Sequence, residues 1–259
     1  MIATQVLQTP DGAAVGVRHA GSIGPALVFV HGVGSTAAIW DMQLAAFADR
    51  YRCFSIELRG NGVPPDPDPS LITRPGFASD VLTVLDWAGV ERATLVGCSL
   101  GGVVGFELWS RAPERIESYV IVGSFAKYPD GQVYADGVKE AVRAAGDMTS
   151  FARMRAAKLS MPPDREAETI EQMALKSVTS YLASTQATWT GDYTAVLLTI
   201  TVRSLVTCGE RDAVAPPALS RAIASGIPGS RYELVPDAGH VANADNPQAF
   251  NAMLEKFLA

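Results

Sequence analysis

Short apolar runs alternate with longer amphipathic segments along most of the chain. The apolar runs are ALVFV at 26–30, CFSIEL at 53–58, ATLVGC at 93–98, SYVIVG at 118–123 and RSLVTCGE at 203–210. Runs that are apolar on both faces are typical of strands covered by helices on both sides, and the segments between them have a helical pattern. The alternation therefore predicts an α/β fold with a mostly parallel central sheet flanked by helices.

The first twenty residues follow a different pattern. Two strand-like stretches at 2–7 and 14–19 are separated by Pro10, Asp11 and Gly12, a combination that favours a tight turn. We therefore expect an antiparallel hairpin ahead of the parallel strands.

A long helical stretch interrupts the alternation before the run at 203–210. It includes GVKEAVRAAG and EAETIEQMALKSVTSYLAST and has no strand-like run. An insertion between two parallel strands emerges at one edge of the sheet and covers what lies there. We expect a core formed by residues 1–123 and 196–259, with residues 124–195 as a helical lid.

Composition and charge argue against several classes of partner. With 259 residues, of which 48% are hydrophobic and 19% charged, the chain can bury one large core. The formal net charge is −6, and no run of Lys or Arg is present. A protein of this charge lacks the basic surface that binds nucleic acid or an anionic membrane, so neither is expected as a partner.

The N-terminal residues and the cysteines bear on the cellular compartment in which the protein is expected. The first residues lack the basic and apolar regions of a secretion signal, and no stretch of eighteen apolar residues follows. Cys53, Cys98 and Cys208 each lie in or at the end of an apolar run, which indicates buried, reduced thiols. We expect a cytoplasmic protein.

Residues 60–70, GNGVPPDPDPS, are rich in Pro, Gly and Asp and predict a surface loop. Asp66 and Asp68 are interpreted as solvated residues of this loop, because no further ligand cluster accompanies them. No metal site is predicted.

Residues 96–102 read VGCSLGG and link a predicted strand to a predicted helix. A serine on such a tight turn has a strained backbone and an outward-pointing hydroxyl, and the small residues Gly97 and Gly101 avoid collisions around it. The start of the following helix places the N–H of Leu100 near any anion that forms beside Ser99. This arrangement suits a nucleophile.

A serine nucleophile needs a histidine as base, and the histidine needs a carboxylate to orient it. The chain has three histidines. His19 falls in the predicted hairpin and His31 directly follows the first parallel strand, whereas His240 lies in the loop PDAGHVANADNP after the last strand. We interpret His240 as the base.

Two carboxylates at the end of the apolar run at 203–210, Glu210 and Asp212, are candidates for the orienting acid. Asp212 lies two residues deeper in the turn than Glu210, just before the next predicted helix. We favour Asp212 and keep Glu210 as the alternative. The order Ser, Asp, His along the chain then matches the order in α/β-hydrolases.

Four motifs in this order resemble the α/β-hydrolase superfamily over nearly the whole length of the chain. They are HGVG at 31–34, GCSLG at 97–101, GERD at 209–212 and AGHVANADNP at 238–247. The last motif is similar to that of a group containing 3-oxoadipate enol-lactonases, small carboxylesterases and carbon-carbon bond hydrolases.

The resemblance implies an α/β-hydrolase fold and a role for each motif. By this resemblance Ser99 is the nucleophile, Asp212 the orienting carboxylate and His240 the general base and then acid. The backbone N–H groups of Val33 and Leu100 would form the oxyanion hole.

One loop departs from the pattern DxRGxGxS that such proteins have. This chain reads ELRGNGVPP at 57–65, with Glu57 in place of the Asp, and with Val63 and Pro64 where the Ser is expected. The departure affects the shape of one wall of the pocket and leaves the three proposed catalytic residues untouched.

These features predict a serine hydrolase that cleaves an ester, a lactone or a related activated carbonyl compound through an acyl-enzyme. One alternative is a carbon-carbon bond hydrolase that acts on a diketone or ring-cleavage product with the same residues. Another, of a different class, is a ligand-sensing or signalling protein on the same scaffold. HGVGS lacks the GxGxxG spacing, so no cofactor is implied. The expected partner is a small-molecule substrate, and the oligomeric state, a homodimer included, stays open.

Substrate contacts are expected from residues near the oxyanion loop, the lid entrance and the histidine loop, namely His31, Trp40, Phe125, Trp189 and Val241. Further lid candidates, for which ordinary packing is the alternative, are Phe151, Met154, Met161, Met173 and Tyr181. A basic cluster in the lid either binds a substrate carboxylate or forms a solvated helix face; it consists of Arg153, Arg155 and Lys158.

Overall fold

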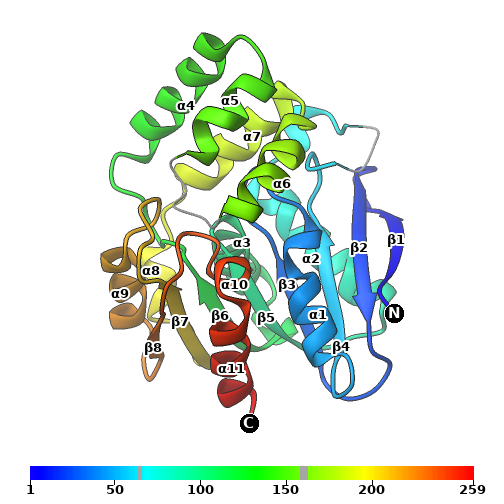
Figure 1. Cartoon of the computed structure of the whole chain (residues 1–259). Helices are drawn as coiled ribbons and strands as arrows, with labels where there is room; N and C mark the ends of the chain where they lie inside the picture. The colour runs from blue at the N-terminus through cyan, green and yellow to red at the C-terminus, as the bar shows by residue number, and fades with distance from the viewer. Residues whose placement is uncertain (63–65, 158–162) are drawn as a thin grey trace.

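The computed structural model describes residues 1–62, 66–157 and 163–259 and is built around an eight-stranded sheet (Figure 1). The strand order is β1-β2-β4-β3-β5-β6-β7-β8. The strands are β1 (Ala3–Gln8), β2 (Ala14–Ala20), β3 (Ala26–Val30), β4 (Arg52–Glu57), β5 (Ala93–Cys98), β6 (Ile116–Val122), β7 (Arg203–Gly209) and β8 (Arg231–Val235).

The pairing of these strands confirms the predicted fold class. From β4 across to β8 all neighbours are parallel, whereas β1 pairs antiparallel with β2, and β2 with β4. The predicted N-terminal hairpin and the mostly parallel sheet are therefore both present.

Alternate residues of the central strands face two separate hydrophobic cores. In β3, Leu27 and Phe29 belong to one core, and Val28 and Val30 belong to the other. Side chains of α1 (Asp41–Phe47) and α11 (Pro247–Leu258) complete the first core. Side chains of α2 (Arg74–Trp87), α3 (Leu100–Arg111) and α9 (Pro217–Gly226) complete the second. Strands covered on both faces explain the continuous apolar runs in the sequence.

Four of the helices between β6 and β7 lie beyond one end of the sheet, at the top of Figure 1. They are α4 (Gly131–Ala145), α5 (Met148–Ala156), α6 (Pro163–Ala174) and α7 (Val178–Trp189), and we call them the inserted helices. They share a small core of their own that includes Phe151, Met173 and Tyr181. The remaining short elements are Ala37–Trp40, Pro69–Leu71, Pro113–Arg115, α8 (Thr194–Leu197) and α10 (Ala242–Asp245).

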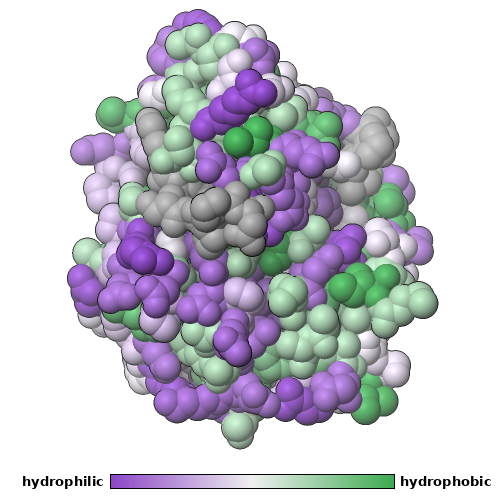
Figure 2. Space-filling view, viewed as in Figure 1, coloured by the Kyte–Doolittle hydropathy of each residue, from purple (hydrophilic) through white to green (hydrophobic). Residues whose placement is uncertain are grey.

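The surface is of mixed polarity on the side that Figure 2 shows, where strongly hydrophobic residues are scattered among hydrophilic ones. No described helix has both the length and the apolar character needed to cross a membrane. Asp66 and Asp68 are exposed, and the three cysteines are unpaired and buried, as the sequence predicts.

Candidate active site

Ser99 lies at the sharp turn between β5 and α3. Its φ of 54° and ψ of −112° are strained for a residue with a side chain. The chain passes so closely through the turn that a Cβ on Gly97 would lie 2.3 Å from the Gly101 carbonyl carbon, and one on Gly101 would lie 2.2 Å from the Val30 oxygen. Only glycine fits at these two positions, so the sequence pattern around Ser99 follows from the geometry of the turn.

Two backbone N–H groups close to Ser99 lack a hydrogen-bond acceptor among the described residues: those of Val33 and Leu100. Leu100 begins α3, where N–H groups are free to bind an anion. The loop that carries Val33 runs against the serine, because a Cβ on Gly32 would lie 3.1 Å from the Ser99 Cβ. These groups meet the chemical requirement for an oxyanion hole.

His240 is held by Asp212, which follows β7. The Nδ1 atom of His240 lies 3.0 Å from Oδ1 and 2.9 Å from Oδ2 of Asp212. The same Oδ1 accepts hydrogen bonds of 2.9 Å from the N–H groups of Val214 and Ala215, so the carboxylate is fixed from both sides. Glu210, the other candidate acid, is exposed.

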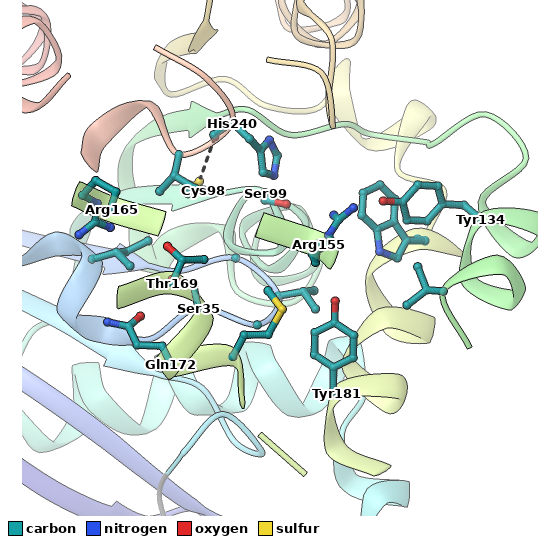
Figure 3. A pocket seen from close by; sticks show the side chains of 18 residues that line it. Ser35, Cys98, Ser99, Tyr134, Arg155, Arg165, Thr169, Gln172, Tyr181 and His240 are labelled. Carbon is teal, nitrogen blue, oxygen red and sulfur yellow. Dashed lines mark hydrogen bonds between the residues drawn. The ribbon is translucent and has the colours of Figure 1, made fainter. Parts of the chain in front are cut away.

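The structure therefore brings together Ser99, His240 and Asp212, from three separate parts of the chain. In Figure 3 the imidazole ring of His240 points toward Ser99. A proton on Nδ1 of His240 is bound to the carboxylate, which leaves Nε2 with the lone pair that a general base needs. This arrangement can activate a hydroxyl as a nucleophile.

A cavity opens above Ser99 and is roofed by the inserted helices (Figure 3). Of the predicted substrate contacts, Trp189 and Val241 line this cavity, and of the further lid candidates Met173 and Tyr181 do so. Cys98, which the sequence predicts as a buried thiol, lines it too, with its Sγ 3.9 Å from the His240 carbonyl oxygen. Met161 and Lys158 lie outside the described residues.

Three predicted substrate contacts lie away from the cavity lining, each for a packing reason. Trp40 is fully buried between Phe29 and Phe250 in the core on the α1 side. Phe125 stacks behind Trp189, with ring centroids 4.8 Å apart, so that Trp189 separates it from the cavity. His31 points into the protein beneath the oxyanion loop.

His31 braces the loop that carries Val33. Its Nδ1 lies 2.8 Å from the Gly32 carbonyl oxygen, and its Nε2 accepts a hydrogen bond of 3.2 Å from the N–H of Leu58. This pattern requires a neutral ring with the proton on Nδ1. Burial lowers the pKa of His31 to about 3, which agrees with the neutral form.

Sequence reasoning missed a buried cation, Lys176, which ties the inserted helices to the sheet. Lys176 lies between α6 and α7, and its Nζ donates to the backbone oxygen of Asn61 and lies 3.9 Å from Oε1 of Glu57. Glu57 in turn accepts a hydrogen bond of 2.8 Å from the N–H of Ala37. The glutamate that replaces the usual aspartate therefore joins the oxyanion loop region to the inserted helices.

The pH dependence of stability is expected to report on Glu57. Burial raises its pKa to about 7 from 4.5, against the opposing effects of the Lys176 charge and the Ala37 N–H. A raised pKa means that the folded state binds the proton more tightly. The stability from this proton is complete below pH 4.5 and is lost as the pH rises through 7, in total about 3 kcal/mol.

The measurement is the free energy of unfolding in urea between pH 5 and pH 8, for the wild type and for Glu57→Gln. The difference between the two proteins reports the titration of Glu57 together with its coupling to His31, whose Nε2 lies 3.5 Å from Oε1 of Glu57. A difference that stays constant across this range would contradict the assignment.

Comparisons with known proteins bear on this site. A family profile described as alpha/beta hydrolase fold matches residues 25–247. The chain is 29% identical to 3-oxoadipate enol-lactonase 2 of Acinetobacter baylyi, covering 89% of this chain and 87% of that one. It is 31% identical to a putative carbamate hydrolase RutD of Azorhizobium caulinodans, covering 90% and 91%. The enol-lactonase structure from Burkholderia xenovorans superposes with a TM-score of 0.89 at 25% identity, covering 98% and 99%.

Proposed function

Because the chain belongs to the α/β-hydrolase family, we propose that it hydrolyses carboxylic esters or lactones of small molecules through an acyl-enzyme on Ser99. One observation carries the proposal: a strained serine lies beside a histidine held by a buried carboxylate and beside two unpaired N–H groups. The names of the relatives, an enol-lactonase and a carbamate hydrolase, agree with a substrate that contains an activated carbonyl group.

The proposed cycle has two steps that share the same groups. Oγ of Ser99 attacks the carbonyl carbon while Nε2 of His240 takes the hydroxyl proton, and the N–H groups of Val33 and Leu100 stabilise the negative oxygen. The bond to the leaving oxygen then breaks, and His240 gives its proton to that oxygen. In the second step His240 takes a proton from water, the hydroxide attacks the acyl group, and Ser99 recovers its proton through His240.

The inserted helices would act as a lid over this chemistry. They supply Tyr134, Tyr181 and Trp189 to the cavity wall, and these side chains exclude water from one side of the acyl group. The hydrophobic wall strengthens the electrostatic effect of the oxyanion N–H groups, because it lowers the local dielectric constant.

An acyl group on Ser99 is the expected product of mixing the protein with a 4-nitrophenyl ester. We expect a burst of 4-nitrophenol equal to the enzyme concentration, followed by slower turnover. Mass spectrometry of the tryptic peptide 93–111, with fragmentation to separate Ser99 from Cys98 and Ser110, locates the acyl group.

The control is Ser99→Ala, which should give neither burst nor acylated peptide. A panel of lactones and a diketone, assayed in parallel, tests the carbon-carbon alternative, which would show preferential cleavage of the diketone. A folded protein that turns over none of these compounds would overturn the hydrolase proposal and favour a ligand sensor.

A further inference from the structure

The cavity above Ser99 contains an arginine that the proposed cycle does not use. Arg155 comes from α5, and Figure 3 shows its side chain between Ser99 and Tyr134. Arg155, Tyr134 and Val138 also line a second cavity, of about 370 Å³, next to Val214. Arg155 therefore belongs to the wall that closes the catalytic cavity on this side.

No carboxylate among the side chains that the structure describes lies within 4.0 Å of the Arg155 guanidinium. The second arginine of the cavity differs in this respect, because Arg165 forms an ion pair with Glu168 on its own helix. A guanidinium in an apolar wall favours a carboxylate partner, which it binds through two charge-assisted hydrogen bonds.

The surroundings of Arg155 are aromatic and largely shielded from water. Trp189 and Tyr181 line the same part of the cavity and are 4% and 5% exposed. Burial raises the pKa of Tyr181, and the positive charge of Arg155 opposes this rise, so the two side chains interact electrostatically. In such surroundings an ion pair with a ligand is screened less than at the protein surface.

The position of the other arginine indicates which end of a substrate faces Arg155. Arg165 lies on the opposite side of Ser99 in Figure 3, beyond Cys98. Burial raises the pKa of Asp245 to about 6, and the Gly239 N–H and the charge of Arg165 oppose this rise, so Arg165 acts electrostatically on the side of the cavity that carries His240. Since His240 protonates the leaving oxygen, the leaving group faces that loop, and the acyl part extends toward Arg155.

We propose that Arg155 binds a carboxylate on the acyl part of the substrate, so that the enzyme prefers monoesters of dicarboxylic acids to neutral esters of the same length. This inference rests on the proposed hydrolase function. Arg155 would raise the specificity for such substrates without taking part in the bond changes, since the guanidinium holds the far end of the acyl chain.

The test compares charged and neutral substrates of matched size. Ethyl monoesters of succinic, glutaric and adipic acid are each assayed against the corresponding ethyl ester in which an amide replaces the free carboxylate. We expect kcat/KM for at least one chain length to favour the carboxylate by about 30- to 100-fold, the usual effect of hydrogen bonds to a charged group.

The variant Arg155→Gln should abolish most of this preference while slowing the amide substrate much less. Arg155→Lys should restore part of it, because it keeps the charge but not the paired geometry. The matched control is Arg153→Gln, which removes the same charge from an exposed position on the same helix and should keep the preference.

Four outcomes would overturn the inference. Equal hydrolysis of both members of each pair by the wild type would rule out the carboxylate subsite and leave the hydrolase proposal intact. An equal loss of the carboxylate preference in Arg153→Gln and Arg155→Gln would have the same meaning. A preference for esters whose carboxylate lies in the alcohol part would reverse the assignment of the acyl end. Absence of hydrolysis of every ester by the folded protein would overturn both proposals.

Discussion

Asparagine at position 212 is expected to lower kcat for ester hydrolysis by about 10⁴-fold, the size of effect found when a catalytic histidine loses its carboxylate. The reason lies in the second set of hydrogen bonds to Asp212. Oδ1 accepts from the N–H groups of Val214 and Ala215, so an asparagine would keep its oxygen there. Its NH₂ group would then face Nδ1 of His240, which lies 2.9 Å from Oδ2 in the wild type.

An NH₂ group in that place donates to Nδ1 and forces the imidazole proton onto Nε2. His240 in this form cannot take the proton of Ser99, so kcat falls while KM changes little. The matched control is Glu210→Gln, which neutralises the exposed carboxylate two residues away and should leave kcat within about twofold. Equal losses in the two variants, or a larger loss at Glu210, would show that the acid was assigned to the wrong residue.

The sequence predicts the three candidate catalytic residues well because each of them follows the end of a strand. Ser99 follows β5, Asp212 follows β7 and His240 follows β8, and these parallel strands lie close together in one sheet. Apolar runs locate the strands, and parallel strands end at the same edge. A short search through three histidines and two carboxylates then suffices to nominate the residues.

The wall of the cavity is harder to predict. Helical periodicity indicates which side of a helix is buried, but it does not indicate which residues of other elements pack against that side. Trp40 follows the oxyanion loop in sequence, yet it packs against Phe250 from the C-terminal helix and does not line the cavity, whereas its neighbour Ile39 does. The sequence around Lys176 carries no signal of burial, and the burial of Lys176 against Asn61 depends on how the inserted helices dock onto the sheet. Such contacts are set by tertiary packing, for which the local pattern carries no signal.

The loop after β4 is held by a buried ion pair between Arg59 and Asp80, and removing one partner should strongly destabilise the protein. The Arg59 guanidinium and the Asp80 carboxylate are both fully buried, with Arg59 Nε 2.8 Å from Oδ1 and the Arg59 N–H 3.0 Å from Oδ2. Among the described residues, Asp80→Asn would leave the buried charge of Arg59 with Asp11 as its one remaining carboxylate partner. We expect a loss of about 3–5 kcal/mol in the free energy of unfolding.

Urea unfolding at pH 8 measures this loss with the Asp80 carboxylate ionised, since burial raises its pKa to about 7 against the opposing hydrogen bonds from Arg59. Asp11→Asn, at an exposed partner of the same arginine, should cost about 1 kcal/mol or less. The double variant Arg59→Met, Asp80→Leu should recover part of the stability, because it leaves no unpaired charge. A loss below about 1 kcal/mol for Asp80→Asn would contradict the assignment.

The same pair should also affect how the inserted helices are held. Arg59 and Asn61 belong to one short loop, and the Asn61 backbone oxygen accepts the hydrogen bond from Lys176. Loosening this loop in Asp80→Asn removes the fixed acceptor on which Lys176 docks. Hydrogen exchange should therefore rise in the segment around Lys176 in Asp80→Asn and stay unchanged there in Asp11→Asn, so the stability of the sheet and the placement of the cavity roof depend on one buried ion pair.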